Sequence, residues 1–179
     1  MRTIETVVYK FDELSDKAKE KAVENLFYVN LECFDWWDST YEDAANIGLK
    51  ITAFDLDRAS YVKGDFYGPA LDVAKRIIEE HGEQCGTYQT AKDYMAEYNR
   101  LVVEQCQEDA DKLYSEFAAE MDLSWDIDTE DIDAEFLHSH CEDYRIILQN
   151  EYEYLTSEET IIETIEANEY EFTTEGEMI

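Results

Sequence analysis

The sequence predicts an α+β protein: a small antiparallel or mixed sheet with about six helices, one of them long. Leu49–Arg58 and Ser60–Tyr67 alternate apolar and polar side chains on either side of a short break, as the strands of a central hairpin do. Alternation at Thr3–Tyr9 and Glu169–Thr174 predicts an N-terminal and a C-terminal strand. The longest helical periodicity covers Thr90–Met121. No Pro- or Gly-rich linker divides the 179 residues, so we expect one acidic domain over residues 1–179.

The first two helices follow from cap residues and from periodicity. Ser15 precedes a run of strong helix formers and is placed to cap a helix there. Ala18 and Ala22 fall at helical spacing, so we expect them on the buried side of this helix. A second helix is predicted over Asp35–Ile47, where Gly48 is placed to end it.

The remaining helices lie on both sides of the long periodic run. Pro69 suits the first position of a helix that ends near His81. A short helix is predicted after Thr129, and a separate one over Glu142–Leu155. Thr156-Ser157-Glu158-Glu159 has the form of a capping box, which introduces a last helix over Glu158–Ala167.

The hairpin carries three aspartates that form a candidate metal site. Strict alternation places five side chains on one face of the first strand, namely Leu49, Ile51, Ala53, Asp55 and Asp57. With Asp65 on the second strand, Asp55 and Asp57 offer oxygen ligands of the kind that hard divalent cations prefer. The alternative is that they occupy the solvent end of the sheet and pair with Arg58 or Lys63.

Two other segments suggest metal ligands at first sight. Asp126–Asp133 resembles a calcium loop, but Asp131 stands where glycine is required and Leu137 where a bidentate Glu belongs. These acids are better explained as stabilising a helix start. His138–Cys141 offers three soft ligands, yet its two histidines diverge by about 200° around a helix, so we expect no metal there.

The net charge of −31 far exceeds the roughly 2 to 8 units that solubility requires of a small domain. Three Trp, eight Phe and 13 Tyr are too many aromatic residues for a disordered acidic tail. From Leu113 onward there are 21 acidic residues and one basic residue, a balance of −20, against 24 and 13 before it, a balance of −11. The sequence therefore predicts a folded protein with its most intense anionic surface in the C-terminal part.

The composition excludes several classes of function. Nucleic acids and anionic membranes attract basic surfaces, and the field here has the opposite sign. No sequence motif of hydrolases, kinases, metalloproteases or dinucleotide-binding enzymes occurs, so we expect neither an enzyme nor a cofactor. Four scattered cysteines without CxxC spacing favour reduced packing residues, and no apolar run approaches the ~20 residues of a membrane span. We expect a cytoplasmic location.

The charge instead predicts a basic protein partner. Carboxylates at i, i+4 on a helix lie about 6 Å apart, so rows of them can occupy a groove lined by Lys and Arg. The candidate rows are Glu104, Glu108 and Asp111; Glu116, Glu120 and Asp122; Glu151 and Glu153; and Glu158, Glu159, Glu163 and Glu166. Tyr152 and Tyr154 interleave with them and would supply aromatic anchors. The alternative for each row is an ordinary solvated face.

Three segments carry a resemblance to a known group of proteins. They are Phe11–Ser15, followed by Ala18 and Lys21-Ala22, then Phe54–Arg58, and Glu151–Ser157. They resemble small acidic proteins of bacteriophages and related mobile elements, which are usually uncharacterised or labelled antitoxin-like. The resemblance spans nearly the whole chain, rests on caps and strands, and carries over no catalytic residue. It implies a phage context, in which a protein of this size and charge resembles DNA-mimicking inhibitors of host defence.

Three functional interpretations result. The first is an acidic inhibitor that occupies the nucleic-acid groove of a bacterial defence protein, with binding that weakens steeply with salt and is competed by DNA. The second is an antitoxin-like partner of one basic toxin. The third is a divalent-cation protein or enzyme at Asp55, Asp57 and Asp65, in which a metal ion would raise the melting temperature. Adaptation to a salty host could also produce the acidity, and would make folding depend on molar salt.

Overall fold

The computed structural model describes residues 7–32, 35–115 and 128–179, and for residues 106–115 it describes the backbone alone. The chain divides into two compact units. The first contains residues 1–39 and 148–179, and the second contains residues 40–147. The predicted α+β class is confirmed at the level of several helices and one hairpin of two antiparallel strands.

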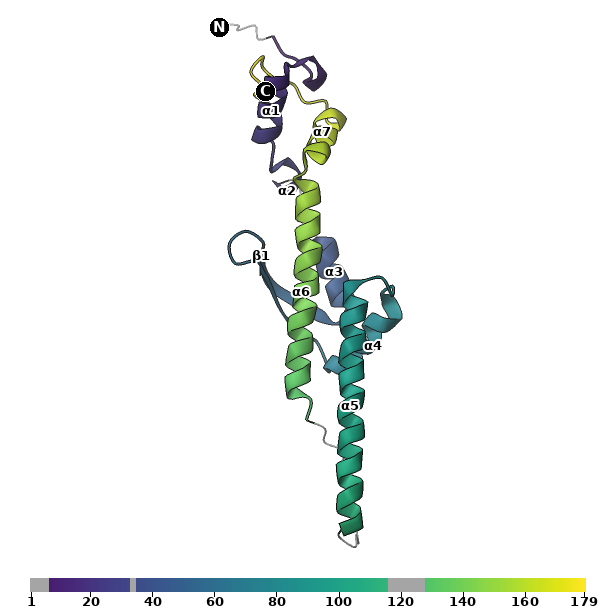
Figure 1. Cartoon of the computed structure of the whole chain (residues 1–179). Coiled ribbons are helices and arrows are strands. Elements are labelled where there is room, and N and C mark those ends of the chain that lie inside the picture. Colours follow the sequence, from purple (N-terminus) through teal and green to yellow (C-terminus); the bar gives the residue numbers. More distant parts are fainter. Residues whose placement is uncertain (1–6, 33–34, 116–127) are drawn as a thin grey trace. The chain divides into compact units, whose positions relative to one another are not determined.

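The first unit is built on three helices, α1 (Asp16–Asn25), α2 (Val29–Glu32) and α7 (Glu158–Ala167), preceded by a 3-10 turn at Phe11–Glu13. Helices α1 and α7 lie side by side (Figure 1). Their buried side chains form one core with the 3-10 turn and the C-terminal segment. It consists of Phe11, Leu14, Ala18, Ala22, Ile161, Ile165 and Phe172. The predicted buried side of the first helix is thus confirmed.

Serine caps begin both α1 and α7. The Ser15 hydroxyl accepts a hydrogen bond from the backbone N–H of Ala18 at 3.4 Å, as the sequence predicts. Helix α7 has the predicted bounds, but its cap is Ser157, which accepts from the N–H of Thr160 at 3.3 Å. Thr156 is therefore not the cap, because its hydroxyl donates to the carbonyl of Tyr152 at 2.8 Å.

The predicted C-terminal strand is wrong, and no N-terminal strand occurs at residues 7–9. The rest of the predicted N-terminal strand, residues 3–6, lies outside the described residues. Tyr9 and Phe172 exchange two backbone hydrogen bonds of 2.9 Å, and an isolated bridge joins Phe172 to Met178, but no ladder continues from either. The chain turns back at Gly176, whose N–H donates to the carbonyl of Thr173 at 3.0 Å. The alternation near the C-terminus reflects Phe172 packing into a helical core, because a period of two appears wherever every second side chain is buried.

The second unit contains the hairpin and most of the helical residues. Its elements are α3 (Asp38–Ile47), β1 (Leu49–Asp55), β2 (Tyr61–Phe66), α4 (Ala70–Glu80), α5 (Gly86–Ser115) and α6 (Glu130–Leu155). Residues 130–147 of α6 belong to this unit and residues 148–155 to the first. Helices α4 and α5 pack against each other. The predicted helix after Pro69 is confirmed, with Ala74 and Ile77 fully buried.

There are two long helices among the described residues, where the sequence predicts one. The short helix after Thr129 and the separate helix over Glu142–Leu155 form the single helix α6 (Figure 1). Neither Gly nor Pro occurs between Glu130 and Leu155, so nothing interrupts the backbone hydrogen bonds at the polar His138–Glu142 segment. Helix α5 begins at Gly86, four residues before the predicted start at Thr90.

A β-bulge at Thr52 changes which side chains share a face of the hairpin. Ile51 pairs with Gly64 and Ala53 with Lys63, so Thr52 has no opposite residue. Phe54 therefore joins the face of Leu49 and Ile51, opposite the buried Val62. Asp55 and the end of the strand move to the other face. The predicted grouping of Asp55 with Leu49 is wrong, because strict alternation does not survive an extra residue.

Candidate partner-binding surfaces

Helix α7 separates its buried side from its acidic side completely. Thr160, Ile161 and Ile165 are buried in the core of the first unit. At 100° per residue, the opposite arc carries four exposed glutamates around the half-buried Ile162. They are Glu158, Glu159, Glu163 and Glu166. We call this surface the α7 acidic face. It coincides with one of the predicted carboxylate rows.

Among the described residues, the α7 acidic face has no ion pair of its own; Lys10 lines the same surface hollow as Glu166 but pairs with Glu171. Residues 148–179 include ten Glu and no Lys or Arg. The ion pairs of the described part of the first unit are Lys10 with Glu171 at 3.6 Å and Lys21 with Glu177 at 3.1 Å. Among the described residues, no Lys or Arg nitrogen therefore lies within 4.0 Å of the four carboxylates on this face. Their negative potential is directed at solvent.

The spacing of these charges can be compared with that of a nucleic acid. Glu158 and Glu166 are eight residues apart, which corresponds to about 12 Å of helix axis at 1.5 Å per residue. The four charges are separated by about 4 Å on average along the axis, close to the spacing of about 3.4 Å between the charges of a single DNA strand. The linear charge density is that of one strand and is lower than that of a duplex.

The end of α6 adds two further acids and two tyrosines to the first unit. Tyr154 is 59% exposed, so its ring is available to a partner. Tyr152 is half-buried, and its ring centre lies 6.1 Å from that of the buried Trp36, so it takes part in packing. Glu153 is exposed and accepts a hydrogen bond from Gln149 at 2.8 Å, while Glu151 is half-buried. Of the two predicted aromatic anchors, Tyr154 fits the role better.

The other predicted rows are only partly described. Glu104 is exposed, but the guanidinium of Arg100 holds it, so its charge is largely compensated. Glu108 and Asp111 lie on α5, and their side chains fall outside the described ones. Glu116, Glu120 and Asp122 lie outside the described residues.

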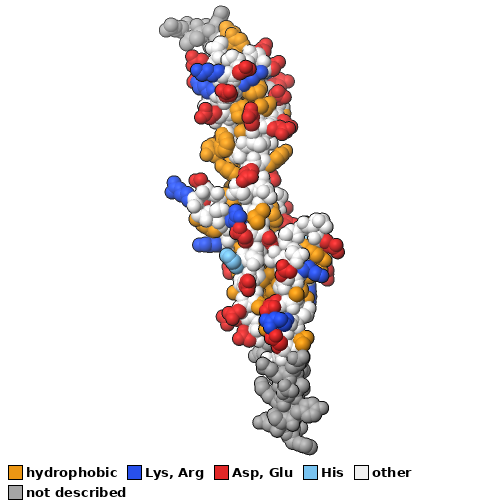
Figure 2. All heavy atoms as spheres, viewed as in Figure 1, with side chains coloured by type: hydrophobic (Ala, Val, Ile, Leu, Met, Phe, Trp, Pro, Cys, Tyr) orange, Lys and Arg blue, Asp and Glu red, His pale blue; other side chains and the backbone are white. Residues whose placement is uncertain are grey.

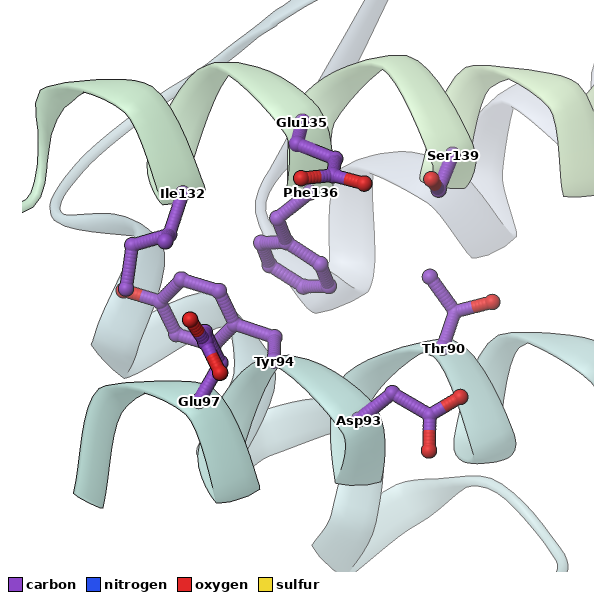
Figure 3. A pocket seen from close by; sticks show the side chains of 8 residues that line it. All are labelled: Thr90, Asp93, Tyr94, Glu97, Ile132, Glu135, Phe136 and Ser139. Carbon is purple, nitrogen blue, oxygen red and sulfur yellow. The ribbon is translucent and has the colours of Figure 1, made fainter. Parts of the chain in front are cut away.

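The second unit contains an acidic cleft between the facing parts of α5 and α6 (Figure 3). Its volume is about 370 Å³. The residues that line it are Thr90, Asp93, Tyr94, Glu97, Ile132, Glu135, Phe136 and Ser139. Four come from each helix, in both cases at positions i, i+3, i+4 and i+7 of one face. We call this feature the α5–α6 cleft; the sequence shows each half of it but not that the halves face each other.

The floor of the α5–α6 cleft is aromatic and its rim is charged. The rings of Tyr94 and Phe136 stack with centres 4.5 Å apart and are 6% and 3% exposed. Burial, together with the hydrogen bond that its hydroxyl donates to Asp133 at 2.6 Å, raises the pKa of Tyr94. Hydrogen bonds from Arg100 lower the pKa of Glu97 at the rim. Both groups keep their usual charge at neutral pH.

His140 lies behind this floor and is completely buried. Its ring stacks on Phe136 with centres 5.6 Å apart and meets Tyr144 edge-on at 5.2 Å. Neither ring nitrogen has a hydrogen-bond partner in the described structure, and the nearest carboxylate oxygen, on Asp143, is 3.9 Å from Nδ1. His138, by contrast, is exposed. Among the described residues, no three His, Cys, Asp or Glu side chains are grouped so that they could hold a metal ion.

A histidine-centred contact links three elements of the second unit without forming an accessible nucleophile. The hydroxyl of Thr87 and Nδ1 of His81 share a hydrogen bond of 2.7 Å, and Nε2 of His81 lies 3.7 Å from Asp43. Asp43 also accepts a hydrogen bond of 2.6 Å from the hydroxyl of the buried Tyr144. Thr87 is only 3% exposed, so this hydroxyl cannot reach a substrate, and the contact joins α3 to the start of α5.

The three candidate metal ligands on the hairpin are separated by its register. Asp55 pairs with Tyr61 near the turn, whereas Asp65 pairs with Lys50 near the other end. One carboxylate oxygen of Asp55 accepts the backbone N–H of Asp57 at 2.9 Å and of Arg58 at 3.1 Å. These bonds, that of Arg58 foremost, lower the pKa of Asp55. Asp55 thus has a structural role in shaping the turn.

Replacement of Asp55 by asparagine is expected to remove part of the acid sensitivity of the hairpin. Because the folded-state pKa of Asp55 is lowered, its carboxylate stabilises the fold above the unfolded-state pKa of about 3.9, and this stability is lost as the pH falls below that value. Thermal unfolding from pH 7 to pH 3 should show the wild type more stable than Asp55→Asn at neutral pH, with the difference becoming smaller towards the acid end. Asp57→Asn is the control, because the Asp57 carboxylate accepts no hydrogen bond among the described residues. A difference between wild type and Asp55→Asn that persists unchanged at pH 3 would contradict this account.

None of the described helices combines the length and the hydrophobicity that crossing a bilayer requires. In comparisons with known proteins, no family model matches the chain, and neither the curated proteins nor the solved structures yielded a match.

Proposed function

We propose that this protein is an acidic inhibitor of the phage type that binds the nucleic-acid groove of a bacterial defence protein. The α7 acidic face supplies the main contact, and its carboxylates occupy positions that phosphates would take. The observation that carries the proposal is the absence, among the described residues, of any Lys or Arg within 4.0 Å of the four glutamates on this face. Uncompensated charge on a rigid helix is complementary to a cleft lined by Lys and Arg.

The scale of the proposed mimicry follows from the distribution of charge. On the face shown in Figure 2, neutral and hydrophobic side chains separate the Asp and Glu side chains from one another. Within either unit, the described side chains show no continuous ridge of Asp and Glu on that face. The proposal therefore concerns the phosphates of one strand over the length of α7, where the charge density matches. Tyr154, which is exposed near the end of α6 in the same unit, would add an aromatic anchor.

A second candidate function is that of an antitoxin-like protein, which neutralises one basic toxin. The same uncompensated face favours it, since a toxin with a cationic surface would be attracted equally well. The two functions differ in competition. A groove that normally holds nucleic acid releases the inhibitor when DNA is added, whereas a cognate toxin surface that does not bind DNA does not.

The deciding experiment uses two variants with the same net charge. One replaces Glu158, Glu159, Glu163 and Glu166 by Gln, and the other replaces four exposed glutamates of the second unit, Glu42, Glu79, Glu80 and Glu83, by Gln. The wild type and both variants are each immobilised and exposed to a bacterial lysate at low and at high ionic strength. The bacterial proteins that the wild type retains are then purified and tested for DNA binding. Melting temperatures establish that both variants are folded.

We expect the α7 variant to bind the retained protein at least tenfold more weakly than the control variant does. Binding to the wild type should weaken steeply with salt, because several charge pairs form together. Duplex or single-stranded DNA should compete for the same partner. Equal affinity of the two variants would overturn the role of the α7 acidic face, and a tight partner that DNA does not displace would replace inhibition by the antitoxin-like function.

Unfolding at low and high salt separates recognition from adaptation to a salty host. If the acidity serves recognition, the protein should be fully folded at about 10 mM salt, where the Debye length is about 30 Å and self-repulsion is strongest. Circular dichroism and thermal melts would measure this. A chain that folds only in molar salt would show that the acidity is an adaptation to salt and would remove the argument for a partner.

A further inference from the structure

The α5–α6 cleft presents acidic side chains from two helices around one opening (Figure 3). Glu135 and Ser139 project from α6 on one side, and Thr90 and Glu97 from α5 on the other. Its volume of about 370 Å³ is at the small end of the range for ligand pockets, roughly 300–1,000 Å³. It has room for one long side chain or a small ligand.

The chain itself shows which group the rim of this cleft binds. The guanidinium of Arg100 donates hydrogen bonds to both Glu97 and Glu104. Glu97 lines the cleft, so a guanidinium already lies against one of its carboxylates. The planar guanidinium has five N–H donors in a fixed geometry that suits carboxylates, which is why such pairs are specific as well as strong.

The remaining carboxylates of the cleft have no such cation. Asp93 accepts a hydrogen bond of 2.7 Å from the uncharged Gln89, and no hydrogen bond to Glu135 occurs among the described residues. No Lys or Arg nitrogen of the described part of the chain lies within 4.0 Å of either carboxylate. Ser139 offers a hydroxyl oxygen on the same rim. These oxygens are acceptors that can take further hydrogen bonds from the donors of a charged ligand.

The aromatic floor favours a cation with an apolar stem. Tyr94 and Phe136 are buried and form an apolar bottom to the cleft, while Asp93 and Glu135 at its rim are exposed. The methylene groups of an arginine side chain can lie along this apolar floor while the guanidinium stays at the acidic rim.

We propose that the α5–α6 cleft binds an arginine side chain of the basic partner. This inference rests on the proposed function for the identity of the partner, but the binding of a guanidinium to the cleft can be measured without that partner. Arg100 then acts as an internal competitor, since it occupies Glu97 when no partner is bound.

The test uses a short blocked peptide, acetyl-Gly-Arg-Gly-amide, and the same peptide with citrulline, the uncharged isostere of arginine. Both are titrated into the isotopically labelled full-length protein at low salt, and amide shifts are followed by NMR. We expect the arginine peptide to shift the amides of Thr90 and Ser139, and to leave that of Gly68, outside the cleft, unchanged. The citrulline peptide should bind at least tenfold more weakly.

Two pairs of charge-matched variants make the test specific. Asp93→Asn combined with Glu135→Gln should weaken the arginine peptide about tenfold, whereas Glu79→Gln combined with Glu80→Gln, on the exposed side of α4, should change it less than twofold. Arg100→Gln should tighten binding two- to fivefold by freeing Glu97. Lys92→Gln, on an exposed position of the same helix, makes the same change in net charge and should have a smaller effect.

The site would be overturned if the two acidic double variants weakened binding of the arginine peptide equally. It would also be overturned if the citrulline peptide bound as tightly as the arginine peptide. A lysine peptide that binds as tightly as the arginine peptide would overturn the assignment to a guanidinium. The two proposals can fail separately. If the α7 variant loses the partner but no peptide binds at the cleft, only this inference is removed. Peptide shifts at the cleft without any effect of the α7 variant would remove only the proposed role of the α7 acidic face.

Discussion

Replacement of Gly176 by alanine is expected to lower the free energy of unfolding of the first unit by about 3 kcal/mol or more. Gly176 is buried and has a φ of +80°, a conformation that costs a residue with a Cβ roughly 1–2 kcal/mol. A Cβ at this position would also lie 2.1 Å from the carbonyl oxygen of Ala18, so the C-terminal segment would have to move away from α1. Phe172, which this segment inserts into the core, would lose its packing.

Urea unfolding of Gly176→Ala beside Gly68→Ala measures this effect. Gly68 is exposed, and a Cβ added there would meet no heavy atom within 4 Å. Alanine at this position should be neutral or stabilising by less than about 1 kcal/mol, since it reduces the freedom of the unfolded chain. Similar midpoints for the two variants would show that the C-terminal segment does not lie against α1 as described.

Replacement of Phe136 by alanine is expected to destabilise the second unit by about 3–5 kcal/mol. Phe136 is 3% exposed, and its ring centre lies 4.5 Å from that of Tyr94, 5.2 Å from Phe66 and 5.6 Å from His140. Removing the ring leaves a cavity where β2, α5 and α6 meet. It also leaves the imidazole of His140, which has no hydrogen-bond partner among the described residues, without its stacking surface.

Two variants calibrate this expectation in the same urea unfolding experiment. Phe136→Leu keeps most of the volume and should cost about 1–2 kcal/mol. Tyr67→Ala removes a ring of comparable size that is 65% exposed, just after β2, and should change the stability by less than about 0.5 kcal/mol. A loss below 1 kcal/mol for Phe136→Ala would mean that this aromatic layer is not the core of the second unit.

Much of the local structure could be predicted because its causes are local. The Ser15 cap, the helix after Pro69, the bounds of α7 and the existence of the hairpin each depend on neighbouring residues. The α7 acidic face belongs to the same class. Its buried and exposed sides are separated by helical period alone, and the absence of Lys and Arg from residues 148–179 is visible in the sequence.

The errors occurred where distant contacts or a single inserted residue decide the outcome. The bulge at Thr52 moves Asp55 to the other face, and no residue type marks it in advance. The alternation at Glu169–Thr174 could be satisfied by a strand or by Phe172 packing on helices. The sequence predicts two helices over residues that form the single helix α6, although neither Gly nor Pro occurs between Glu130 and Leu155.

By itself, the sequence determined an acidic α+β chain, the positions of most of its caps, and a C-terminal helix with one anionic side. Only the tertiary structure decided that the terminal segments form isolated bridges and that Asp93 and Glu97 of α5 share a cleft with Glu135 of α6. The reason is that helical period and cap chemistry act within about one turn, whereas the pairing of α5 with α6 depends on side chains some 40 residues apart in the chain.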